Sequence, residues 1–174
     1  MNEAMQNLLT RRSCRKYKPD MLPQDVLDEI LTAGTYAATG RGNQSPVMIA
    51  VTNKELRDKL SRLNARIFGN PDIDPFYGAP VVVIVLANKQ YPTYIYDGSL
   101  VMGNLMHAAH AKGIASCWIH RAKEEFELPE GKAILKELGI EGDYEGIGHC
   151  ILGYADCPEA APAPRKENYI YYIK

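Results

Sequence analysis

Positive side chains are concentrated in one short segment near the start of the chain. Arg or Lys occupies five of the eight positions in Arg11–Lys18, which reads RRSCRKYK, although the 174-residue chain has a formal net charge of only −1. Arginine presents planar, paired donors that match phosphate oxygens, and Ser13 adds a hydroxyl at the same place. One candidate role is therefore a pocket for a small phosphorylated ligand, which a second basic group, Arg165 and Lys166, could close.

The same basic segment could instead be a solvated surface or could bind an acidic partner or a nucleic acid. A charge run is most often a solvated surface, and a basic run can also bind an acidic partner without any catalysis. Nucleic-acid contact usually needs several basic stripes with aromatic residues between them. Here Tyr17 is the only aromatic residue nearby, and 20 basic residues are balanced by 21 acidic ones, which argues against nucleic-acid binding. Spacing alone does not choose between the remaining roles.

Metal and thiol chemistry have weaker support. His107 and His110 have a spacing that can bind a metal from one helix, but no third ligand accompanies them, so two satisfied buried histidines are favoured over a metal site. Basic neighbours would lower the pKa of the Cys14 thiol if it were exposed. The cysteines form no C-x-x-C pair, and we expect them to be reduced and mostly buried; they are Cys14, Cys117, Cys150 and Cys157.

The composition indicates one globular domain over residues 1–174. Hydrophobic residues make up 46% and charged residues 24%, which is ordinary for a globular chain that buries a substantial core. No apolar run approaches the roughly 20 residues of a membrane span, and no apolar stretch of a secretory signal is present at the N-terminus. We therefore expect a cytoplasmic protein with no membrane contact.

Hydrophobic periodicity predicts the elements that must position the basic segment. Helices are predicted over 3–9, 22–38, 54–63, 96–113 and 129–139, and strands over 47–52, 81–87, 114–119 and 146–154. Asn53 is a candidate N-cap. The run at 81–87 is apolar throughout, as expected of a central strand covered on both faces. Irregular alternation of helices and strands indicates an α+β or mixed α/β class, with helices packed on a modest sheet.

The C-terminal segment 168–174, NYIYYIK, is aromatic and β-prone, and a Pro-rich arm joins it to the rest of the chain. Two arrangements are open. The segment could form an edge strand of its own sheet, or it could reach out and pair with the sheet of another subunit.

Four blocks of the sequence resemble the FMN-dependent nitroreductase family, in the family's order and over nearly the whole chain. The blocks are RRSCRKYKPD, AATGRGNQSPVMIAVTN, GIASCWIHRAKEEF and LGYADCPEAAPAPRK. The resemblance implies an α+β, nitroreductase-like fold with a central mixed or antiparallel sheet flanked by helices. It also implies an intertwined homodimer with FMN at the subunit interface, in which the C-terminal segment crosses to the partner.

The resemblance further implies a role for the basic residues. Those matching the family's phosphate and ribityl contacts are Arg11, Arg12 and Ser13, with help from Arg165 and Lys166. Arg15 matches a residue that faces the pyrimidine edge of the flavin. A cation there stabilises the reduced flavin and raises its reduction potential.

The remaining cofactor residues implied by the resemblance come from two other blocks. The loop Thr39–Ser45 would come from the partner subunit and lie against the flavin; its members are Thr39, Gly40, Arg41, Asn43 and Ser45. A backbone N–H near His120 would face flavin N5, with Trp118 and Ile119 beside it, although Trp118 also suits core packing. Val47 replaces the family's usual aromatic residue. The central segment that shapes the substrate pocket in larger relatives is reduced here to residues 68–80, so the resemblance does not predict a specific substrate.

The implied activity is a two-step transfer. NADH or NADPH reduces FMN, and a small nitroaromatic, quinone or similar conjugated acceptor then reoxidises it, with no catalytic acid or base from the protein. Two alternatives stay open. One is a flavoprotein of the same fold with different chemistry, such as reductive dehalogenation, flavin cleavage or dehydrogenation. The other is a non-enzymatic module that binds an acidic partner.

Overall fold

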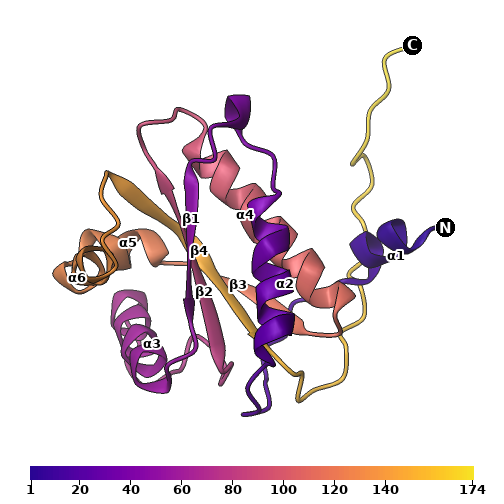
Figure 1. Cartoon of the computed structure of the whole chain (residues 1–174). Coiled ribbons are helices and arrows are strands. Elements are labelled where there is room, and N and C mark those ends of the chain that lie inside the picture. Colours follow the sequence, from indigo (N-terminus) through magenta and orange to yellow (C-terminus); the bar gives the residue numbers. More distant parts are fainter.

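A four-stranded antiparallel sheet runs through the middle of the protein (Figure 1). The computed structural model describes residues 1–174. The strands lie in the order β1-β2-β4-β3 and are β1 (Pro46–Val51), β2 (Val81–Asn88), β3 (Ala115–Ile119) and β4 (Tyr144–Gly153). Every neighbouring pair is antiparallel. The predicted α+β class is confirmed, and the sheet is antiparallel rather than mixed.

The central strand β2 divides the core into two layers. Val81, Val83 and Val85 belong to one apolar cluster. The alternate residues of the strand, including Val82 and Ile84, belong to the other. Successive strand side chains point to opposite faces, so an unbroken apolar run is buried only when both faces are covered. The prediction for 81–87 is confirmed.

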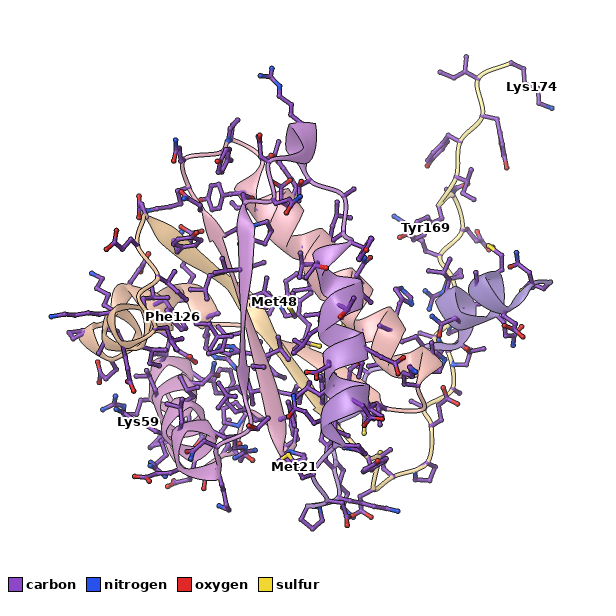
Figure 2. All side chains as sticks on the ribbon, viewed as in Figure 1. Met21, Met48, Lys59, Phe126, Tyr169 and Lys174 are labelled. Atoms are coloured by element: carbon purple, nitrogen blue, oxygen red, sulfur yellow. The ribbon has the colours of Figure 1, made fainter.

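Helices cover both faces of the sheet (Figure 1). One face packs against α2 (Gln24–Thr35) and α4 (Tyr94–Ala111), which contribute Ile30 and Leu105 to the core. The other face packs against α3 (Lys54–Phe68), α5 (Ala122–Glu127) and α6 (Pro129–Glu137). Figure 2 shows Met48 between the sheet and α2, and Phe126 in the opposite layer.

Local capping chemistry explains where α3 begins and ends. The Asn53 side chain accepts a hydrogen bond from Leu56 N at 2.9 Å, so the predicted N-cap is confirmed. Gly69 ends the helix in the left-handed region, with φ of 84°. The short helix α5 was not predicted, because its six residues are too few to show a clear period.

The two ends of the chain lie away from the sheet. The first helix, α1 (Glu3–Thr10), lies near the C-terminal end of α4, and the tail passes beyond it with Tyr169 and Lys174 far from the core (Figures 1 and 2). No strand follows β4, and the tail is exposed. An edge strand at 168–174 within its own sheet is therefore wrong. No helix in the structure has the length and apolarity needed to cross a membrane.

Candidate functional site

The basic segment runs along the free edge of β3. Ser13 pairs with Ser116 in a parallel bridge, and Cys14 N donates to Ser116 O at 3.0 Å. Helix α1 is fastened to α4 just before this segment, because Thr10 Oγ1 and His110 Nε2 lie 2.8 Å apart in a hydrogen bond. The residues from Arg11 to Ser13 are therefore held between the end of α4 and the start of β3.

These contacts leave a pocket beside the basic segment. Its volume is about 360 Å³. Basic and polar side chains, the start of β3 and the C-terminal arm form its walls; they include Arg11, Arg12, Ser13, Cys14, His110, Ser116, Cys157 and Glu159. The sequence prediction that the first three of these residues meet in one pocket agrees with this geometry, whereas His110 and Cys157 were not expected there.

Two guanidinium groups in this pocket have unpaired donors. Arg11 Nη1 and Arg12 Nε are buried and have no hydrogen-bond partner. Arg12 is fixed in place, since its Nη1 donates to Leu9 O at 2.9 Å and to Arg11 O at 2.7 Å. Buried charged donors without an acceptor are strongly unfavourable. An anion bound beside these two arginines would supply the missing acceptors.

The neighbouring histidines do not add a metal site. Burial, followed by the charges of Arg11 and His110, lowers the pKa of His107, so the positive charge here comes from the arginines. No group of three or more His, Cys, Asp or Glu side chains could hold a metal ion. The expected pair of satisfied buried histidines is only partly confirmed: both residues are half-buried, His110 is bonded to Thr10, and His107 Nδ1 has no partner.

The loop Thr39–Ser45 lies at the opposite end of α4 and contains the short 3-10 helix η1 (Gly40–Gly42). Asp97, a buried carboxylate in the first turn of α4, accepts hydrogen bonds from Gly40 N at 2.9 Å and from Ser45 Oγ at 2.8 Å. A Cβ at position 40 would lie 2.3 Å from Thr93 Oγ1, so this tight turn needs glycine. Asp97 was not identified from the sequence, because the only sign of it there is its place as an acidic residue near the start of a predicted helix.

This anchoring separates the loop from the basic pocket within one chain. Asp97 and His110 are 13 residues apart on the same helix (110 − 97), which corresponds to about 20 Å. In the loop, Arg41 and Asn43 are exposed, whereas Ser45 is buried and its hydroxyl is already bonded to Asp97. The structure therefore groups the predicted loop residues together but does not bring them to Arg11.

A second cavity, of about 500 Å³, lies at the other end of β3 and includes Trp118 and His120 in its lining. The indole Nε1 of Trp118 is buried without a partner. Ile119 points to the opposite face of the sheet, into the core layer that contains Phe126. From Ser116 to His120 the chain advances about 13 Å, so the two cavities lie at the two ends of one strand. Trp118 packs against the core, as predicted, and also lines this cavity, whereas its contact with the flavin stays a prediction.

A network of buried polar side chains from α3, α5 and β4 is bonded to the chain just after β3. Asn64, Glu125 and His149 are fully buried. Asn64 Nδ2 donates to His120 O at 2.9 Å and to a Glu125 carboxylate oxygen, and the other oxygen pairs with His149 Nε2 at 2.9 Å. Arg121, which has φ of 78°, donates from Nε to Asn64 Oδ1 at 2.8 Å. Sequence reasoning missed this network, whose signal is a lone His149 in an apolar strand.

The remaining predicted residues are exposed. Arg15 lies just beyond the pocket with its side chain in solvent. Arg165 donates to Ala163 O at 2.7 Å within the arm, and Lys166 Nζ lies 5.1 Å from the Tyr169 ring centroid. A single chain therefore does not bring the late basic pair to the early one.

Comparison with known proteins relates this arrangement to one family. The Nitroreductase family matches residues 8–154. A solved nitroreductase with bound FMN from Bacteroides fragilis is 28% identical, with a TM-score of 0.90 over the whole of both chains. A protein from Archaeoglobus fulgidus with the provisional name NADH dehydrogenase/NAD(P)H nitroreductase is 29% identical over 88% of this chain and 86% of its own. An FMN reductase [NAD(P)H] from Bacillus subtilis is 34% identical over 51% of this chain and 33% of its own.

Proposed function

Because the chain belongs to the nitroreductase family, we propose that it is an FMN-dependent oxidoreductase that passes electrons from NADH or NADPH to a small conjugated acceptor such as a nitroaromatic or a quinone. We infer that residues 1–174 act as one nitroreductase-like domain. The observation that carries the proposal is the pair of half-buried arginines, Arg11 and Arg12, each of which has one buried guanidinium nitrogen without an acceptor. The names of the relatives, an FMN-bound nitroreductase and an FMN reductase, support the same conclusion.

The residues of the basic pocket fit the phosphate of FMN. Arg11 and Arg12 offer unpaired charged donors, and Ser13 supplies a hydroxyl at the same wall. Glu159 lines the pocket without forming an ion pair with either arginine, so the positive charge is not already neutralised. FMN, when bound, supplies the two-electron transfer between nicotinamide and acceptor. The protein itself would hold the phosphate at the basic pocket, and it offers Trp118 and the turn at His120 as walls of the second cavity.

Exposed apolar surface supports a homodimer with the cofactor at its interface. Met5, Leu8 and Leu9 of α1 are about half exposed, and Tyr171 in the tail is 79% exposed. Exposed apolar surface of this kind often marks an interaction site. A second copy could cover it with its own sheet edge and tail. We propose that the same second copy brings its loop Thr39–Ser45 and its basic arm to the pocket, which one chain alone leaves incomplete.

Absorbance of the purified protein tests the proposed activity. We expect a flavin band near ~450 nm, bleached by NADH or NADPH and restored by menadione or a nitrofuran. A protein that stays colourless with added FMN would contradict the proposal and support a non-enzymatic module. A normal flavin content with no turnover of these acceptors would favour a flavoprotein of the same fold with different chemistry.

Replacing Arg15 by alanine should make the potential of the bound flavin more negative. The exposed Arg15 follows directly on the pocket, and a cation near the pyrimidine edge favours the more negative, reduced form of the cofactor. We expect a shift of about 30 mV, which for a two-electron couple corresponds to about 1.4 kcal/mol. A spectroelectrochemical titration measures it, with Lys18→Ala, another exposed cation of the same segment, as the control. An unchanged potential in Arg15→Ala would refute the role.

Mixing two defective variants should restore FMN binding if the site is shared between subunits. One variant is Arg11→Ala, and the other replaces the exposed Arg41 and Asn43 by alanine. Each homodimer has two damaged sites, whereas a mixed dimer has one intact site and one carrying both defects. After random mixing, about a quarter of all sites should bind FMN as tightly as the unmodified protein. No recovery on mixing would show that the loop and the basic pocket do not complement each other across an interface.

A further inference from the structure

Two thiols from distant parts of the chain meet at the wall of the basic pocket. Cys14 Sγ lies 3.6 Å from Cys157 Sγ, although 143 residues separate them in sequence. Both side chains line the pocket that contains Arg11 and Arg12, and both are free thiols. Cys14 is buried, whereas Cys157 is exposed at the start of the C-terminal arm.

The fold holds these thiols together from both sides. Lys18 N donates to Tyr154 O, and Asp156 N donates to Lys16 O, each at 2.9 Å. Lys16 Nζ also forms an ion pair with Asp156 at 2.9 Å. The chain then bends at Asp156 and Cys157, and the residues that follow the bend, 158–160, line the pocket. The short distance between the sulfurs is therefore maintained by bonds on the residues immediately beside them.

We propose that Cys14 and Cys157 form a disulfide under peroxide, and that this bond ties the C-terminal arm to the basic segment and narrows the phosphate pocket. The sulfurs would close from 3.6 Å to about 2.05 Å. That movement draws in the arm beyond Cys157, which includes Glu159, another residue of the pocket wall. A carboxylate moved toward Arg11 and Arg12 competes with a phosphate for the same donors.

The oxidation needs one molecule of hydrogen peroxide. The exposed Cys157 reacts first: its thiolate attacks one peroxide oxygen, the O–O bond breaks, and hydroxide leaves and is protonated to water, which gives a sulfenic acid. The Cys14 thiol then loses its proton and attacks the Cys157 sulfur, the S–O bond breaks, and the departing hydroxide takes up that proton and leaves as a second water. Two thiols are oxidised and one peroxide is reduced to two waters. Burial raises the pKa of the Cys14 thiol, which makes Cys14 less reactive toward peroxide and agrees with its reacting second.

The expected effect on the cofactor rests on the proposed function. If the disulfide narrows the phosphate pocket, oxidation lowers the affinity for FMN, and bound FMN opposes the disulfide by the same factor, since the two equilibria are linked. We expect the dissociation constant for FMN to rise at least about fivefold on oxidation, at the lower end of the coupling typical between two sites. Reduction with dithiothreitol should reverse the change.

Peptide mapping and FMN titration on the full chain test both parts. After treatment with hydrogen peroxide, removal of the excess and alkylation of free thiols, mass spectrometry should find Cys14 joined to Cys157 and the affinity lowered. Cys157→Ser, a change at an exposed position, should abolish both effects. Cys117→Ala, which removes another thiol near Cys14, should leave both intact.

Three results would overturn the inference: Cys14 joined to Cys117, a cross-link between two chains through Cys157, or a Cys14–Cys157 bond that changes the affinity for FMN less than twofold. A protein that forms the Cys14–Cys157 bond but binds no FMN in either redox state would instead contradict the proposed function. Failure of the disulfide inference and failure of the proposed function can therefore be told apart, because peptide mapping of the disulfide does not depend on FMN binding.

Discussion

Replacing Arg11 by alanine is expected to raise the dissociation constant for FMN about 10- to 100-fold and to leave that for riboflavin nearly unchanged. The buried Arg11 Nη1 has no partner in the protein, and the phosphate of the proposed cofactor would supply its acceptor. A hydrogen bond to a charged group is worth about 1.5–3 kcal/mol, which corresponds to this range of affinity. Fluorescence titrations with both flavins measure the two constants. Riboflavin lacks the phosphate, so the ratio of the two affinities isolates the contribution of the phosphate contact.

Arg11 suits this test better than its neighbour. Arg12 also donates to Leu9 O and Arg11 O, so its removal would disturb the end of α1 as well as the pocket. Arg11→Lys should recover part of the loss, since lysine keeps the charge without the paired donors. Arg62→Ala, an exposed change on α3, is the control for lost positive charge and should leave both affinities unchanged. An equal loss for both flavins in Arg11→Ala would contradict a phosphate role.

Replacing Glu125 by alanine is expected to lower the free energy of unfolding by about 3–5 kcal/mol. The fully buried carboxylate accepts from Asn64 Nδ2 and pairs with His149 Nε2, and both groups would lose their partner in a water-free interior. Such a loss is a large part of the roughly 5–15 kcal/mol that stabilises a typical domain. Urea unfolding measures it, with the fluorescence of Trp118, the chain's single tryptophan, as the probe.

The adjacent position offers a matched control for this prediction. Glu124 lies beside Glu125 on α5 but is exposed, so Glu124→Ala should change the free energy of unfolding by no more than about 0.5 kcal/mol. Both variants should be compared without FMN, because a ligand that binds the folded state adds its own stabilisation. Equal, small effects at both positions would show that the Asn64–Glu125–His149 network does not stabilise the interior.

Features that depend on neighbouring residues in the sequence were predictable. The apolar run in β2 shows a strand buried on both faces, and Asn53 shows the start of α3, because each signal lies within a few residues of its effect. The presence of Arg11 and Ser13 in one pocket was predictable for the same reason, because the two residues are nearly adjacent in an extended segment.

Features that join distant segments were not predictable from one sequence. Asp97 binds Gly40 across 57 residues, and Asn64 binds Glu125 across 61. No local pattern shows such a pairing, because a buried carboxylate is recognised only once its donors are known. Cys14 and Cys157 are a further example: their spacing of 143 residues carries no signal, and only the antiparallel contact of the segments beside them explains their approach.

The C-terminal tail shows a third limit. Its aromatic, β-prone residues indicate a strand, yet the segment after β4 is extended and exposed within one chain. A strand needs a partner for its backbone hydrogen bonds, and the sheet of the same chain does not supply one here. Local propensity therefore indicated a strand that the single chain does not form, and we propose that the segment pairs with the sheet of a second copy of the chain.

The structure of the protein crystallised with FMN tests the central claim most directly. The account predicts that phosphate oxygens lie within about 2.7–3.2 Å of Arg11 Nη1 and Arg12 Nε, the two buried donors that now have no acceptor. A flavin phosphate bound elsewhere, with these donors paired to a carboxylate of the protein, would contradict it.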